Sequence, residues 1–200
     1  MSDNPQPAPI ASLCVYCGAA PGSGKAFVEA AAQLGTLAAQ QGTTIVYGGG
    51  GTGMMGALAD GAMAAKGKVI GVITHSLVTR ELAHPRVADM RVVDSMHQRK
   101  MVMADLSHAF VALPGGYGTL DELFECIAWA QLGIHTRPIG LLNVDGFFDD
   151  LIEFLRNAQR KAFLRLRLQD ALVIEETPED MLEALADCAA YPLAAPTSAR

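Results

Sequence analysis

A glycine-rich segment that ends in carboxylates, Pro114–Glu122 (PGGYGTLDE), has the residue types needed to bind and transform a phosphorylated ligand. Thr119 and Glu122 have the three-residue spacing of a helix-capping box, which alone would give Glu122 a structural role. Capping does not need the three glycines just ahead of Thr119, however. Glycine lets the backbone approach a ligand closely, and the free N–H groups of a helix start attract an anion. We therefore favour a functional role for Glu122 over pure capping.

A second glycine-rich segment, Gly48–Gly56 (GGGGTGMMG), joins an apolar run ending at Tyr47 to a helical pattern. A flexible turn does not need six glycines in nine residues, so we expect the loop to contact phosphate or ribose. It is not a nucleoside-triphosphate loop, because no Lys-Ser/Thr pair follows its last glycine, and the run Gly18–Lys25 also lacks that motif's spacing. No acidic residue closes the second strand as a dinucleotide site requires, which disfavours NAD. The expected contacts are Gly48, Gly49, Gly50 and Gly53.

A third segment, Asp94–Lys100 (DSMHQRK), places two cations at the start of a helix. Ser95 and Gln98 have capping-box spacing, which puts Arg99 and Lys100 in the first helical turn. Cations there oppose the helix dipole, so an anionic partner would explain them. The alternative is an ordinary solvated pair, and the spacing alone does not choose between the two.

The elements that must position these segments alternate along the chain. The central strands are apolar throughout, which is typical of parallel strands covered on both faces. Alternation of strands and helices predicts an α/β fold, a Rossmann-like doubly wound parallel sheet in a single domain. Ligands of such sheets bind beyond the carboxyl ends of the strands, which here means the loops after Cys17, Tyr47, Val93 and Leu113. We expect strands over 13–17, 44–47, 69–73, 90–93, 109–113, 139–143 and 172–174, and helices over 26–41, 54–66, 96–106, 120–131, 147–161 and 178–189.

Length and composition set the limits of this fold. Two hundred residues, half of them apolar, suffice for one domain with a substantial core, which we assign to 11–190 between flexible tails at 1–10 and 191–200. The formal net charge of -6 argues against nucleic-acid binding, which needs a local excess of Lys and Arg. No apolar run is long enough to span a membrane, and the first residues resemble no secretory leader. These features predict a cytoplasmic protein.

The four cysteines raise the question of a metal or a disulfide. Cys14 and Cys17 have CxxC spacing, but they lie in an expected strand, where residues three apart point to opposite faces. Cys126 and Cys188 fall in helical patterns. We therefore expect buried structural thiols, and because the histidines share no ligand spacing we expect no metal site.

Taken together, the three segments resemble the LOG (Lonely Guy) family of cytokinin riboside 5′-monophosphate phosphoribohydrolases. The resemblance runs from about residue 12 to about residue 185 and rests on Gly48–Gly56, Met96–Lys100 and Pro114–Glu122, in that order. Many bacterial relatives carry an older lysine decarboxylase label, which fits poorly because nothing here resembles a pyridoxal-phosphate lysine site.

The resemblance implies a Rossmann-like homodimer that uses no metal or redox cofactor and hydrolyses the N-glycosidic bond of a nucleoside 5′-monophosphate. It implies that Arg99 and Glu122 are the catalytic pair. Ala128 stands where plant members usually have Thr, which leaves open whether the substrate is a cytokinin riboside monophosphate, AMP or both. The family's substrate contacts carry over onto Glu81, Arg99, Lys100, Gly115, Gly116, Tyr117, Gly118, Thr119, Leu120 and Asp121.

Two other classes of function compete with this hypothesis. A non-catalytic nucleotide- or molybdenum-cofactor-binding carrier on the same scaffold would need phosphate contacts but no paired reactive groups, so the presence of Arg99 and Glu122 favours the enzyme. A redox enzyme is the weaker alternative, and binding of NAD or NADP would reveal it.

Overall fold

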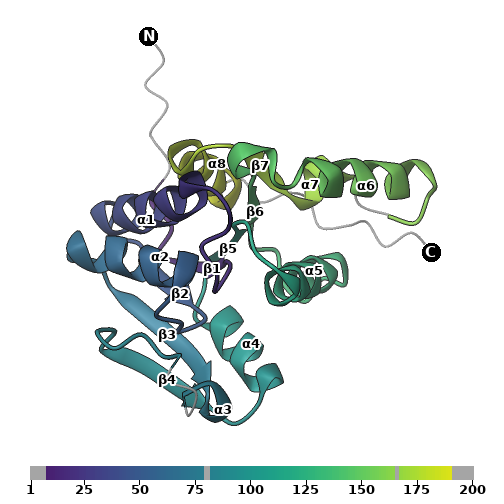
Figure 1. Cartoon of the computed structure of the whole chain (residues 1–200). Helices are drawn as coiled ribbons and strands as arrows, with labels where there is room; N and C mark the ends of the chain where they lie inside the picture. Colours follow the sequence, from purple (N-terminus) through teal and green to yellow (C-terminus); the bar gives the residue numbers. More distant parts are fainter. Residues whose placement is uncertain (1–7, 79–81, 165–166, 191–200) are drawn as a thin grey trace.

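The structure is a computed structural model that describes residues 8–78, 82–164 and 167–190. Within these ranges the chain forms one parallel sheet in the order β4-β3-β2-β1-β5-β6-β7 (Figure 1). Every strand pair in it is parallel. The strands are β1 (Ser12–Tyr16), β2 (Thr44–Tyr47), β3 (Val69–Thr74), β4 (Asp89–Val93), β5 (Ala109–Ala112), β6 (Ile139–Leu142) and β7 (Val173–Glu175).

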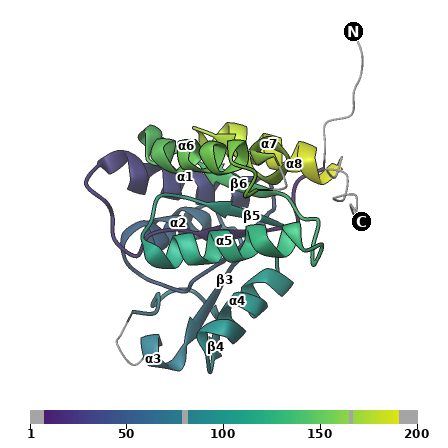
Figure 2. The same ribbon diagram turned by 90° about the vertical axis from the view of Figure 1, so that its right-hand side faces the viewer.

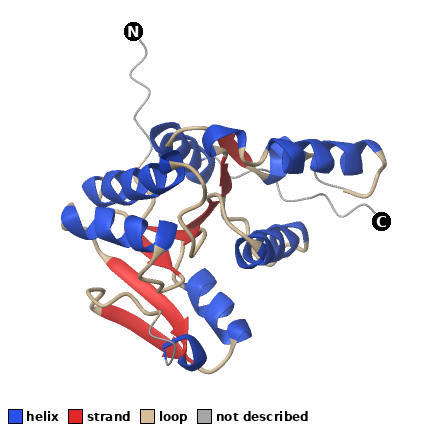
Figure 3. Ribbon diagram, viewed as in Figure 1, coloured by secondary structure: helices blue, strands red, loops and turns tan. Residues whose placement is uncertain are grey.

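Helices cover both faces of the sheet, as Figure 3 shows with strands in red and helices in blue. The helices are α1 (Lys25–Gln40), α2 (Gly53–Ala64), α3 (His75–Val78), α4 (Met96–Asp105), α5 (Tyr117–Gln131), α6 (Asp149–Arg160), α7 (Leu168–Ala171) and α8 (Pro178–Ala190), with a 3-10 turn η1 (Val144–Gly146). In Figures 1 and 2, α3 lies beside β4 at the lower end of the sheet, and α6, α7 and α8 lie towards the β7 end.

The apolar strands explain the two layers. Along β1, Leu13 and Val15 pack into a core with α1, α2 and α8, whereas Cys14 and Tyr16 pack into a second core with α4, α5 and α6. All five residues of β1 are buried, because side chains alternate between two covered faces. The predicted doubly wound parallel sheet is confirmed.

Cys17 belongs to the first core and Cys14 to the second, so the two thiols lie on opposite faces as expected. Burial raises the pKa of the Cys14 thiol to about 12, which keeps it protonated and unreactive. All four cysteines are free. In the described part of the chain, no helix is both long and apolar enough to cross a bilayer.

The predicted strands agree with the observed ones to within one residue at each end. The predicted helices agree to within two residues, except that α5 begins at Tyr117 rather than Leu120. The sequence pattern missed α3, η1 and α7, because elements of three or four residues show no helical periodicity. The expected N-terminal tail overlaps the core by one residue, since Ile10 is buried and its carbonyl accepts a hydrogen bond from Thr43.

The sheet reverses its strand order between β1 and β5, which lie side by side although the chain visits β2, β3 and β4 between them. The loops leaving these two strands diverge to opposite faces, which opens a crevice at their carboxyl ends. The loop after β5 is the glycine-rich segment that leads into α5. The topology therefore directs the candidate site to this edge of the sheet.

Candidate active site

A buried ion pair joins the two expected catalytic residues. Arg99 lies in the first turn of α4 and Glu122 in the second turn of α5, and Nη1 of Arg99 is 2.7 Å from Oε1 of Glu122. The side chains are only 7% and 9% exposed. Arg99 also donates from Nε to the carbonyl of Val72 on β3 at 2.9 Å, so its guanidinium is fixed from two directions. The structure thus brings together two residues that are 23 positions apart.

The solvated-pair alternative for Arg99 and Lys100 is wrong, because both cations have carboxylate partners and Arg99 is buried. The Lys100 amine lies 3.1 Å from Asp121 and 3.0 Å from Glu125 on α5. The anionic partners expected for these two cations are therefore carboxylates of the neighbouring helix α5.

The two predicted capping boxes have different outcomes. Ser95 caps α4 by accepting a hydrogen bond from the backbone of Gln98, as predicted. The capping box at Thr119 and Glu122 is wrong, because α5 begins two residues before Thr119, with Gly116 in the capping position and no side-chain cap. The Glu122 carboxylate binds Arg99 instead of reaching back to the helix start. Its role is therefore not capping.

Burial and the guanidinium act on Glu122 in opposite directions. Removal from water raises the pKa of the Glu122 carboxyl, and the charge and hydrogen bond of Arg99 lower it, with burial the larger effect. A carboxyl whose pKa is raised more readily holds or transfers a proton, and in its ionised form it can stabilise a cation. Both properties suit a residue that takes part in acid–base or electrostatic catalysis.

The two glycine loops differ in what surrounds them. At Gly48 a side-chain methyl would lie 2.0 Å from Nη2 of Arg99, and at Gly53, with φ +58, it would lie 2.2 Å from the carbonyl of Ala19. The space beside Gly53 is therefore filled by the backbone of the chain itself, and the space beside Gly48 by the guanidinium of Arg99. At Gly116 and Gly118 a methyl would meet nothing within 4 Å. The second loop consequently has open space where a ligand can approach the helix start.

The remaining expected contacts lie around this helix start. Thr119 is buried and packs back against Gly115, whereas Tyr117 is 94% exposed and Asp121 is also exposed. Leu120 is half-buried against the core beneath α5. Glu81 lies outside the described residues.

A cavity of about 340 Å³ opens at the point where the strand order reverses. Its walls include Gly115 and Gly116 of the second loop and Met54 of α2, but neither Arg99 nor Glu122 lines it. Another wall is the loop after β1, at 18–23. The rings of Phe27 and Phe147 also line the cavity and pack edge to face, with their centroids 5.8 Å apart. From the sequence alone, no site role was predicted for these residues. Their loop follows β1, and loops after the strands of such a sheet commonly bind ligands, so its position could have indicated a role.

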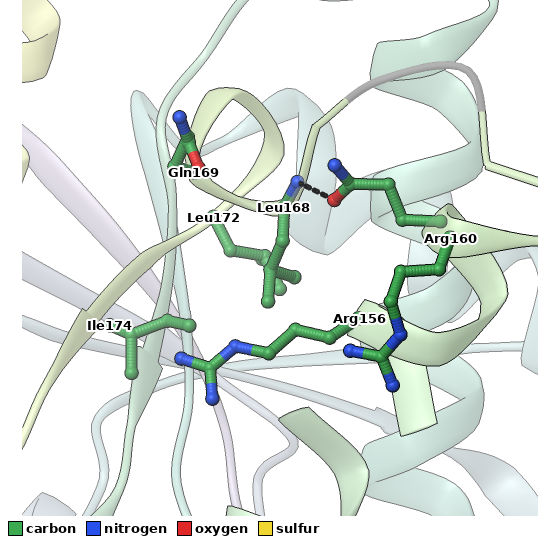
Figure 4. A pocket seen from close by; sticks show the side chains of 7 residues that line it. Arg156, Arg160, Leu168, Gln169, Leu172 and Ile174 are labelled. Atoms are coloured by element: carbon green, nitrogen blue, oxygen red, sulfur yellow. Dashed lines mark hydrogen bonds between the residues drawn. The ribbon is translucent and has the colours of Figure 1, made fainter. Parts of the chain in front are cut away.

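A second hollow of about 470 Å³ lies between α6, α7 and β7 (Figure 4). Figure 4 shows Arg156 and Arg160 beside the apolar side chains of Leu168, Leu172 and Ile174. It contains none of the expected site residues. Both arginines are largely exposed, and the nearest carboxylate to each, Glu153, lies outside the hollow's lining.

The chain is similar to several known proteins. Residues 55–185 match the family model described as "Possible lysine decarboxylase". The chain is 44% identical over 173 residues to a probable cytokinin riboside 5′-monophosphate phosphoribohydrolase of Oryza sativa subsp. japonica, which covers 86% of this chain and 71% of that protein. It is 42% identical over 177 residues to a cytokinin riboside 5′-monophosphate phosphoribohydrolase of Arabidopsis thaliana, covering 88% of this chain and 82% of that one.

Solved structures show the same architecture. A molybdenum cofactor carrier protein from Chlamydomonas reinhardtii matches with a TM-score of 0.67 and 21% identity, over 90% of this chain and 98% of that chain. A molybdenum cofactor binding protein from Rippkaea orientalis matches with a TM-score of 0.65 and 24% identity, over 88% and 95%. At such identities the likeness shows a shared fold alone. The family model and the identities above 40%, in contrast, show that the chain belongs to the LOG family.

Proposed function

We propose that the protein hydrolyses the N-glycosidic bond of a cytokinin riboside 5′-monophosphate, of AMP or of both, and so releases the free base and ribose 5-phosphate. The observation that carries this proposal is the buried pair of Arg99 and Glu122, 2.7 Å apart, beside the open glycine loop at the start of α5. The names of the curated relatives support the same activity, which in the cytokinin case would convert the nucleotide into the active hormone.

The chemistry requires a group that tolerates positive charge on the ribose. As the bond from C1′ to the base nitrogen breaks, the electron pair leaves with the base and the ribose ring becomes cationic. A carboxylate at Glu122 stabilises that cation and orients a water, whose oxygen bonds to C1′ and whose proton is finally delivered to the departing base. Arg99 holds the carboxylate in place and offsets negative charge on the leaving base. This hydrolysis needs water alone as co-reactant, so the proposal includes no metal or redox cofactor.

The amides of residues 116–119 are the proposed phosphate site. They lie at the start of the fifteen-residue helix α5, where free N–H groups and the helix dipole attract an anion. Gly115, Tyr117, Thr119, Leu120 and Asp121 are proposed to line the sugar phosphate with them. Lys100 adds a cation next to this row through its contact with Asp121. We retain Gly48, Gly49, Gly50 and Gly53 as proposed contacts to the nucleoside, together with Glu81.

Substituting Gly118 by Ala is expected to separate binding from stability. Gly118 is the second residue of α5 and lies in open space, so alanine there should stabilise the helix, by at most the interior value of about 0.5–1 kcal/mol. The same methyl would meet an approaching phosphate and raise the KM for the nucleotide. Thermal unfolding and steady-state kinetics of the variant measure the two effects. An unchanged KM would argue against a phosphate at this turn.

We further propose that the enzyme is a cytoplasmic homodimer that binds neither nucleic acid nor membranes. Exposed apolar side chains on α4 and α5 support a second copy as partner: Met96 is 47% exposed, Met101 49% and Phe124 39%. Four free thiols suit a reducing compartment, and the acidic balance disfavours a nucleic-acid partner.

Incubation of the protein with AMP and with isopentenyladenosine monophosphate tests the proposed activity. We expect free base and ribose 5-phosphate to appear in equal amounts, and the ratio of kcat/KM for the two nucleotides gives the preferred base. Tight nucleotide binding without base release from either substrate would contradict hydrolysis and point to a carrier.

A further inference from the structure

A short strap of chain, residues 82–86, crosses the first glycine loop. The amide of Gly51 donates to the carbonyl of Leu82 at 2.9 Å, and the amide of His84 donates to the carbonyl of Gly49 at 2.9 Å. Gly50 and Ala83 form an antiparallel bridge between the two hydrogen bonds. A side-chain methyl on Gly51 would lie 3.0 Å from the Cα of His84, so the strap lies directly on the loop backbone.

The strap is held down by a buried histidine. His84 is 5% exposed, and both nitrogens of its ring are engaged. Its Nδ1 accepts a hydrogen bond from the backbone of Arg86 at 3.2 Å, so in the neutral ring the hydrogen is on Nε2, which donates to Oδ1 of Asp60 on α2 at 3.1 Å. The guanidinium of Arg86 contacts the same Asp60 oxygen from the solvent side. Asp60 and His84 therefore anchor the strap to α2.

The 48–51 loop, which the strap covers, lies next to the guanidinium of Arg99. Gly48 directly precedes the strapped residues, and the guanidinium of Arg99 packs against it, so that a side-chain methyl at this position would displace Nη2. The other fixed contacts of that guanidinium are the carbonyl of Val72 and the carboxylate of Glu122. If the 48–51 loop moved, the Arg99 guanidinium would lose its packing against Gly48 and would keep only the contacts to Val72 and Glu122.

We infer that Asp60 and His84 are positioning residues, which hold the 48–51 loop against Arg99 and so fix the guanidinium towards Glu122. This inference rests on the proposed function for its catalytic consequence, but the geometric part stands without it. Both residues act through the strap and the loop, and they touch neither Arg99 nor Glu122. The first glycine loop then serves as the rigid support of the catalytic arginine.

The decisive variants are Asp60→Ala and Asp60→Asn. Alanine removes the acceptor for His84, whereas asparagine retains an oxygen at the same place. We expect Asp60→Ala to lower kcat about 10- to 100-fold, the range for a misplaced catalytic group, while Asp60→Asn stays close to wild type. Affinity for inorganic phosphate, measured by calorimetry, should be unchanged in both, because the proposed phosphate site lies on α5 and not on the 48–51 loop. His84→Ala should behave as Asp60→Ala does.

A readout independent of turnover is the hydrogen exchange of the Arg99 Nε–H, followed by NMR. Asp60→Ala should speed this exchange, and Arg86→Ala, which leaves the His84–Asp60 hydrogen bond intact, should not. Leu185→Ala on α8, a truncation in the core, serves as the control for lost stability alone. If Asp60→Ala lowers kcat no more than this control, or leaves the Nε–H exchange unchanged, the inference is overturned. If the wild-type protein releases no base, the proposed function fails, and the exchange experiment still tests the positioning.

Discussion

Glu122→Gln should lower kcat for base release by about 10³-fold while leaving the affinity for the nucleotide within a few-fold of wild type. The amide has nearly the shape of the carboxylate and can still face Arg99, so the buried site should stay packed. It cannot carry the negative charge that stabilises a cationic ribose, nor accept a proton from water. Because these interactions develop in the transition state, the loss should appear in kcat rather than in KM.

The matched control is Glu153→Gln. Glu153 forms an ion pair with Arg160 at 2.8 Å, as Glu122 does with Arg99, but it lies exposed on α6. The same chemical change there should leave turnover unchanged. Retained turnover in Glu122→Gln, with binding intact, would remove this carboxylate from the mechanism.

Arg99→Met is expected to cause the largest loss of stability. It leaves the buried carboxylate of Glu122 without its partner, and breaking a buried pair in this way costs about 3–5 kcal/mol. Arg99→Met combined with Glu122→Gln removes the unpaired charge and should recover most of this free energy of unfolding while remaining inactive. Urea unfolding of the two variants measures the difference.

The loss in Arg99→Met should also depend on pH. Burial raises the pKa of Glu122 in the folded protein, and both lowering effects of Arg99 disappear in the variant, so its folded-state pKa rises further. With a raised pKa, the folded state binds the proton of Glu122 more tightly than the unfolded state does. The free energy of unfolding gained in this way is fully present below the unfolded-state pKa and is lost as pH rises through the folded-state pKa. The loss in free energy of unfolding of Arg99→Met relative to wild type should therefore be smaller at about pH 5 than at about pH 8. An equal deficit at both would mean that lost packing, not the unpaired charge, destabilises the variant.

The architecture was predictable because its signals are local. Uniformly apolar strands such as β5 and helical periodicity such as that of α1 follow from burial, and both appear in a single sequence. The start of α5 was not predictable in the same way. Thr119 and Glu122 have capping-box spacing, but Glu122 binds Arg99 on another helix, and such a tertiary partner is invisible to spacing rules.

The candidate site shows the same division. The sequence brought Arg99 and Glu122 together only through the family resemblance, and the structure adds the carbonyl of Val72 and the backbone of Gly48 around the guanidinium. The many glycines of the first loop predicted that another group lies close to its backbone, but composition does not reveal whether that group is a ligand or another part of the chain. At Gly51 it is the strap at His84, a contact between residues 33 positions apart.

A crystal structure of the Glu122→Gln protein with bound AMP tests the central claim most directly, because the slowed variant should retain its substrate. The phosphate oxygens should accept hydrogen bonds from the amides of residues 116–119, and C1′ of the ribose should lie beside the side chains of residues 122 and 99. A nucleotide bound with C1′ out of reach of both side chains, in either subunit of a dimer, would contradict the account.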